Sequence, residues 1–247
     1  MAKHLIREIE KLKKKILSLS AVVEEGVHKA VNSVQRRDDN LAQKVIESDV
    51  EIDHLEVDVE EDCLKLLALH QPVAADLRFI VSVLKLNNEL ERIGDLAVNI
   101  AEHSLFLNSQ ARVDIPFDFP GMAEKAQTML RNALDALVNH DALMARKVRA
   151  ADDEVDEMNR QMYQQVREGI KKQPERLECL LHLLSISRHL ERIADHATNI
   201  AEDVIYIYEG EIVRHTPENH GKSTTNRLGP AVSQILPNVQ AIRLPSE

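Results

Sequence analysis

The sequence has no tryptophan, and only three tyrosines, four phenylalanines and seven glycines occur among its 247 residues. Strands draw on aromatic and β-branched residues, and hairpin turns draw on Gly, Asn-Gly and Pro. The shortage therefore disfavours a β-sandwich, a β-barrel and a Rossmann-type fold, and there is no glycine-rich phosphate loop. Leu, Ala, Glu, Lys, Arg and Val are abundant instead, which predicts an all-α protein.

The sequence also lacks a basic excess. It has 41 acidic against 31 basic residues and a formal net charge of −10. A nucleic-acid-binding protein needs a net basic face to displace counterions, so this balance argues against nucleic acid as a partner. It leaves cation binding open, and 44% apolar residues are ample for a folded core.

Long hydrophobic segments are missing as well. The longest apolar runs, around His182, fall far short of the roughly 18–20 residues that a membrane span needs. The N-terminus leads into an amphipathic pattern without a signal-peptide core. Cys63 and Cys179 each lie in a helical pattern, which favours buried thiols over a disulfide. These features predict a cytoplasmic protein.

Proline and glycine divide the chain into long amphipathic segments. Pro suits the first turn of a helix, so Pro72 and Pro174 are predicted helix starts. Residues 210–247 hold four of the eight prolines and three of the seven glycines, and are predicted to form a polar, flexible tail. The apolar spacing of near 3.6 predicts six helices, at about 2–36, 39–70, 72–107, 120–139, 142–172 and 174–209.

An internal repeat organises these helices. Residues 90–102 (LERIGDLAVNIAE) match residues 190–202 (LERIADHATNIAE) at ten of thirteen positions. Gln71-Pro72 likewise matches Gln173-Pro174, and residues 49–53 match 152–156. We therefore predict a tandem duplication of a three-helix unit, with repeats at 1–107 and 120–209 and a linker at 108–119. Long helices with short connections are expected to pack as two antiparallel bundles, related by a pseudo-twofold axis.

The repeated block carries an acidic stripe. Glu91 and Asp95 lie four residues apart on one helical face, and like charges at this spacing destabilise a helix by about 0.2–0.5 kcal/mol per pair. The second repeat keeps the same stripe. A cation is one compensation, because carboxylate and amide oxygens are hard donors that suit Mg, Mn, Ca or Fe. The alternative is a solvated face, or pairing with Arg92 and Arg192.

These motifs resemble the PhoU family of bacterial phosphate-transport accessory and signalling proteins. The resemblance rests on the two repeated blocks, on Gln71–Arg78 (QPVAADLR) and on Tyr208–His215 (YEGEIVRH), and it covers about residues 4–216. It implies two three-helix bundles that bind metal ions (Fe, Mn, Mg or Zn) through the ExxxD motif. The implied ligands are Glu91, Asp95, Glu191 and Asp195, with weaker candidates Asn99, Glu102, Asn199, Glu202, Asp49, Asp53, Asp152 and Asp156. His196 replaces Leu96 of the first block, so the two sites need not be equivalent.

The resemblance also implies a function. PhoU-like proteins are non-enzymatic negative regulators of phosphate uptake and of the phosphate-starvation response. They act at the cytoplasmic face of the membrane, between the phosphate-specific ABC transporter, including its ATPase subunit, and a sensor histidine kinase. The expected chain is a homodimer with only peripheral membrane contact. No Ser/His/Asp or Cys/His catalytic constellation stands out in the sequence.

Two other readings stay open. A ferritin-like di-iron protein needs two ExxH motifs on facing helices. The chain has Glu25–His28 and Glu51–His54, although neither recurs in the second repeat. A helical scaffold without metal is the other alternative. His182 and His189 share a helical face and are interpreted as packed or surface histidines.

Overall fold

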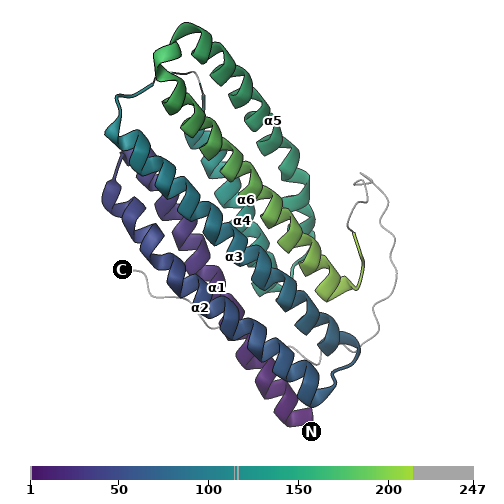
Figure 1. Ribbon diagram of the computed structural model, residues 1–247. Coiled ribbons are helices and arrows are strands. Elements are labelled where there is room, and N and C mark those ends of the chain that lie inside the picture. Colours follow the sequence, from purple (N-terminus) through teal and green to yellow (C-terminus); the bar gives the residue numbers. More distant parts are fainter. Residues whose placement is uncertain (1, 114, 116, 214–247) are drawn as a thin grey trace.

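The computed structural model describes residues 2–113, 115 and 117–213, and these residues form an all-α protein (Figure 1). Its elements are α1 (Ala2–Arg36), α2 (Asp39–His70), α3 (Ala74–Ser109), α4 (Phe119–Asn139), α5 (Ala142–Lys172), a short 3₁₀ helix η1 (Pro174–Arg176) and α6 (Leu177–Glu209). Within this described part there is no strand, which confirms the predicted fold class. Most of the predicted tail, residues 214–247, lies outside the described residues.

The two proline-based helix starts need correction. α3 begins at Ala74 rather than at Pro72, because Val73 is extended (φ −129°, ψ 159°) and serves as the N-cap. Pro174 opens η1, and α6 begins only at Leu177. Proline does favour the start of a helical turn, but it does not by itself determine where the long helix begins.

Helix starts elsewhere follow their capping residues. Asp38 accepts hydrogen bonds from the backbone N–H groups of Asn40 and Leu41 at the start of α2. Asp141, at the matching place in the second repeat, accepts one from Met144 N–H at the start of α5. An aspartate side chain satisfies backbone donors that have no partner inside the helix, so these residues define the two starts.

Two three-helix bundles pack side by side. α1, α2 and α3 contact one another, as do α4, α5 and α6, and the main contact between the bundles is made by α3 with α6 (Figure 1). One continuous apolar core runs through both bundles, built from Leu, Ile, Val and Ala at helical spacing. This arrangement leaves α2 and α5 on opposite outer sides of the molecule.

Candidate metal centres

α2 and α3 approach closely at Gly94, which lies between Glu91 and Asp95. A Cβ at Gly94 would lie 3.0 Å from Cδ1 of the buried Ile52 on α2. This close approach brings the acidic residues that flank Ile52 next to those that flank Gly94. We call the resulting group the first acidic cluster; it consists of Asp49, Asp53 and Glu56 from α2 and Glu91 and Asp95 from α3.

The carboxylates of the first acidic cluster perturb one another. Partial burial raises the pKa of Asp49, and the negative charges of Asp53 and Asp95 raise it further. The pKa of Glu91 is raised by burial, by Asp95 and by Glu56, and Arg92 offsets this only in part. Raised pKa values in both helices show that like charges face each other across the α2–α3 contact.

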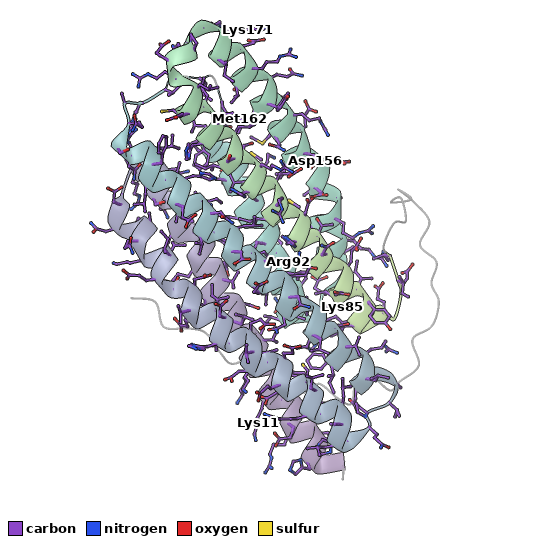
Figure 2. The ribbon with its side chains drawn as sticks, viewed as in Figure 1. Lys11, Lys85, Arg92, Asp156, Met162 and Lys171 are labelled. Atoms are coloured by element: carbon purple, nitrogen blue, oxygen red, sulfur yellow. The ribbon has the colours of Figure 1, made fainter. Side chains whose placement is uncertain are left out.

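The second acidic cluster lies between α5 and α6 and contains Asp152, Asp156, Glu191 and Asp195 (Figure 2 labels Asp156 on α5). Burial and the charges of Asp195 and Asp156 raise the pKa of Asp152 to about 6. Burial and the charges of Glu191 and Asp156 raise that of Asp195 to about 6. The pKa of Glu191 is raised by burial and by Asp156. Charge repulsion is thus repeated at the corresponding place.

The structure therefore brings together eight of the twelve residues named from the sequence, four in each repeat. It adds one that the sequence analysis missed, Glu56, whose pKa is raised by burial and by Glu60 and Asp53. Glu56 Oε1 accepts a hydrogen bond from Asn87 Nδ2 at 3.0 Å. The signal was available, because Glu56 follows Asp49 and Asp53 at helical spacing on one flank of α2.

The equivalent position in the second repeat is Asn159, and this is where the two clusters differ. Asn159 Oδ1 accepts a hydrogen bond from Ser187 Oγ at 2.9 Å. Ser187 in turn replaces Asn87. The first acidic cluster therefore has five carboxylates and the second has four, so the two sites differ at Glu56 and Asn159.

The four remaining candidates follow the cluster residues along α3 and α6. Asn99 donates from Nδ2 to Asp95 O at 2.8 Å, and Asn199 donates to Glu89 at 3.1 Å. Glu202 pairs with Arg149 at 3.2 Å, both side chains being nearly buried. Glu102 is exposed, about three turns beyond Glu91 on α3. As metal ligands these four residues stay a prediction.

The donor chemistry of both clusters fits a hard cation. Every cluster side chain offers carboxylate oxygens, and Asp152 Oδ1 is buried. In the described part of the chain, however, no three His, Cys, Asp or Glu side chains converge tightly enough to enclose an ion. The backbone brings the donors within reach, and rotation of the side chains would be needed to complete a coordination sphere.

The residues of the ferritin-like alternative have other partners. His28 Nδ1 lies 3.0 Å from Gln127 Oε1 on α4, and Glu25 forms an ion pair with Lys29. Glu51 and His54 are exposed on α2. The structure thus provides no support for a four-helix di-iron site from these motifs.

Polar residues also occupy the contact between α3 and α6, which we call the seam. At one end Glu89 Oε2 lies 2.6 Å from His196 Nδ1, and Lys85 lies 3.4 Å from Asp203 (Figure 2 labels Lys85). Burial disfavours the Glu89 carboxylate, but hydrogen bonds from His196 and Asn199 outweigh it and lower its pKa. His196, which stands where the first repeat has Leu96, therefore contributes to the contact between the repeats.

The other end of the seam is a chain of three imidazoles. His103 Nδ1 lies 2.7 Å from His182 Nδ1, and its Nε2 lies 3.4 Å from His189 Nε2. Burial and the neighbouring His103 lower the pKa of His189 to about 4. His182 and His189 are indeed packed histidines, as interpreted, although their partner His103 could not be inferred from the sequence.

No helix in the described residues is long and apolar enough to cross a membrane. The PhoU domain family matches residues 16–104 and 119–204, one match in each bundle. The chain belongs to the PhoU family. A phosphate-specific transport system accessory protein PhoU homolog from Aquifex aeolicus is 37% identical over 211 residues, which cover 85% of this chain and 96% of the relative. A homolog from Thermotoga maritima is 35% identical, with 84% of this chain and 90% of the relative covered.

Solved PhoU structures share the fold of this PhoU-family chain. The crystal structure of PhoU from Pseudomonas aeruginosa superposes with a TM-score of 0.80 at 35% identity, covering 83% of this chain and 99% of that one. The phosphate transport system regulatory protein PhoU from Streptococcus pneumoniae gives 0.75 at 31% identity, with coverage of 85% and 99%. Tandem helical bundles are therefore confirmed.

Proposed function

We propose that this PhoU-family protein is a non-enzymatic negative regulator of phosphate uptake and of phosphate-starvation signalling, and that its two acidic clusters bind metal ions. The observation that carries the proposal is the duplicated meeting of carboxylates from facing helices, α2 with α3 and α5 with α6. Without a cation these charges repel one another, and burial together with this repulsion raises the pKa of Asp152 and that of Asp195 to about 6.

The metal would connect the two helices of each cluster. Carboxylate donors favour Mg, Mn or Fe, and Zn also accepts Asp and Glu oxygens. The residues that would hold it are the carboxylates of the two clusters, with Asp152 offering a buried oxygen. In this proposal the bound ion is structural: it neutralises the clusters and sets the spacing of the outer helices.

The proposed partners are the phosphate-specific ABC transporter, through its ATPase subunit, and a sensor histidine kinase at the cytoplasmic face of the membrane. Support comes from the relatives, which are named accessory or regulatory proteins of the phosphate transport system. We further propose a cytoplasmic homodimer with peripheral contact to that complex. The proposed regulatory role predicts that deletion of the gene leaves the starvation response active in phosphate-rich medium.

Metal content and thermal stability test the metal proposal together. We expect protein purified without chelator to contain metal by elemental analysis, and a chelator to lower its melting temperature. A ligand that binds only the folded state adds about 2.7 kcal/mol of stability at 100 Kd. Asp95→Asn/Asp195→Asn should lower the metal content and abolish the chelator effect, because both changes remove a charged donor and keep the side-chain shape.

A matched variant removes the same charge outside the clusters. Glu61→Gln/Glu157→Gln changes exposed residues that pair with Lys65 and Arg160, so its metal content should equal that of the wild type. If the Asp95→Asn/Asp195→Asn protein keeps full metal loading, these carboxylates are not the ligands. A protein without metal would favour the plain scaffold, and sustained oxidation of Fe(II) by oxygen would favour the ferritin-like alternative.

A further inference from the structure

The outer face of α2 carries three exposed apolar side chains at seven-residue spacing. Val50, Val57 and Leu64 are 59%, 50% and 53% exposed. Seven residues make nearly two helical turns, so the three lie on one side of the helix, about 10 Å apart. We call this line the α2 stripe. It lies opposite the side of α2 that packs into the bundle through Ile52 and Val59.

The second repeat provides an internal comparison for the α2 stripe. The repeat offset that matches Asp49 to Asp152 matches Val50, Val57 and Leu64 to Asp153, Arg160 and Arg167 of α5, all exposed. The same three positions are therefore charged in one repeat and apolar in the other. Single exposed apolar residues are ordinary on protein surfaces. Three aligned ones require an explanation when the second repeat has charged residues at the same positions.

The charge around the stripe restricts what can cover it. α2 contains ten acidic and two basic residues, whereas α5 contains six acidic and seven basic. At 100° per residue, Glu47 and Asp58 flank one side of the stripe and Asp53 and Glu60 flank the other. A second α2 would place acid against acid, which disfavours an α2-to-α2 contact between two copies of this chain.

We propose that the α2 stripe is a docking surface for a basic amphipathic helix of a partner protein. Such a helix would have apolar residues at seven-residue spacing to cover Val50, Val57 and Leu64, and Lys or Arg on both flanks. Glu61, within the stripe, pairs with Lys65 at 2.6 Å and could exchange that partner for a basic residue of the docked helix. Of the residues that carry this proposal, only Asp53 also belongs to the first acidic cluster.

A designed peptide tests the stripe on the full chain. The probe is a fluorescent synthetic helix of three heptads, with Leu at the core positions and Lys at the flanking positions. Fluorescence anisotropy should show saturable binding to the wild type, weakened by added salt. Val57→Gln/Leu64→Gln removes the apolar contact without changing charge, and we expect affinity to fall by about tenfold or more.

The matched control removes two apolar residues of similar exposure from the other repeat. Leu143 and Tyr163 on α5 are 65% and 60% exposed. Leu143→Gln/Tyr163→Gln should leave peptide affinity within about twofold of the wild type. A peptide with Glu in place of Lys should not bind. Thermal melts by circular dichroism should match for all three proteins, and Val50→Gln is a single-site substitute if the double variant melts early.

Three outcomes would overturn the proposal. The first is no binding of the Lys peptide to the wild type. The second is equal binding to Val57→Gln/Leu64→Gln, which would reduce the interaction to non-specific attraction by acidic charge. The third is a wild-type dimer by light scattering that this variant converts to a monomer, which would make a second copy of the chain the occupant.

Discussion

The contact between Ile52 and Gly94 yields a quantitative prediction about how α2 and α3 pack within the first repeat. A Cβ added at Gly94 would lie 3.0 Å from Ile52 Cδ1 and 3.3 Å from its Cγ2. Ile52 is only 3% exposed, so it has little room to move. The equivalent residues of the second repeat are Ala194 and Val155, both buried, and valine has no Cδ1. Each repeat thus holds its own matched pair.

Two effects on the free energy of unfolding oppose one another in Gly94→Ala, whereas Ile52→Val only destabilises. Gly94→Ala gains about 1 kcal/mol of helix propensity, but overpacking costs about 1–3 kcal/mol, so we expect a net loss of up to about 2 kcal/mol. Ile52→Val alone should cost about 0.5–1.5 kcal/mol. The double variant reproduces the pair of the second repeat. We expect its stability within about 1 kcal/mol of the wild type, which gives a favourable coupling of about 1–2 kcal/mol.

Urea unfolding of the four proteins, followed by circular dichroism in chelator, measures this cycle. Gly26→Ala on α1 is the matched control, because nothing lies within 4 Å of a Cβ there. It should stabilise the protein by about 0.5–1 kcal/mol through helix propensity alone. The reasoning is refuted if Gly94→Ala stabilises as much as this control, or if the two changes at the α2–α3 contact are simply additive.

The remaining predictions concern single side chains. Glu89→Ala should cost about 2–3 kcal/mol in urea unfolding, because it leaves His196 and Asn199 without their acceptor, and adding His196→Leu should recover part of the loss. Asp152 has a folded-state pKa of about 6 against an ordinary value of 3.8, so metal-free protein should lose stability as the pH rises from about 4 to 6. This pKa gap corresponds to about 3 kcal/mol of unfolding free energy, and because the side chain is partly exposed we expect a loss of about 1–2 kcal/mol. Asp152→Asn should remove this loss. If the stability difference between the wild type and Asp152→Asn does not change with pH, the prediction is wrong. Burial raises the pKa of the Cys63 thiol to about 12, so a thiol reagent at pH 8 should not modify Cys63 in the native protein. In urea the same reagent should label it. Rapid labelling of the native protein would show that α2 opens.

Local signals in the sequence predicted the helices well. Apolar spacing placed all six helices close to their observed bounds, and the duplicated block gave the correspondence between α3 and α6. The start of α3 predicted from Pro72 was wrong by two residues, because the extended Val73 lies between Pro72 and the helix. The first acidic cluster could be assembled in part from spacing, since Asp49 and Glu91 lie on helices expected to be neighbours.

What the sequence could not provide is the rotation of one helix against another. Spacing places Glu56 on the same flank of α2 as Asp49 and Asp53, but its approach to Glu91 depends on how closely α2 and α3 pack at Gly94. The pairing of Glu89 with His196, and of His103 with His182, depends on how α3 crosses α6. Whether metal occupies the clusters stays a prediction.

The seam has a consequence for how the two halves of the molecule recognise each other. Its twofold-related ends carry different chemistry: Glu89 faces His196, whereas the matching positions hold His189 and Leu96. If two first repeats paired through α3, each Glu89 would face Leu96 in place of His196 and lose that hydrogen-bond donor. If two second repeats paired through α6, His196 would face His189. The diverged seam therefore makes the unlike pair the favoured one, so halves produced as separate chains should assemble as mixed rather than like pairs.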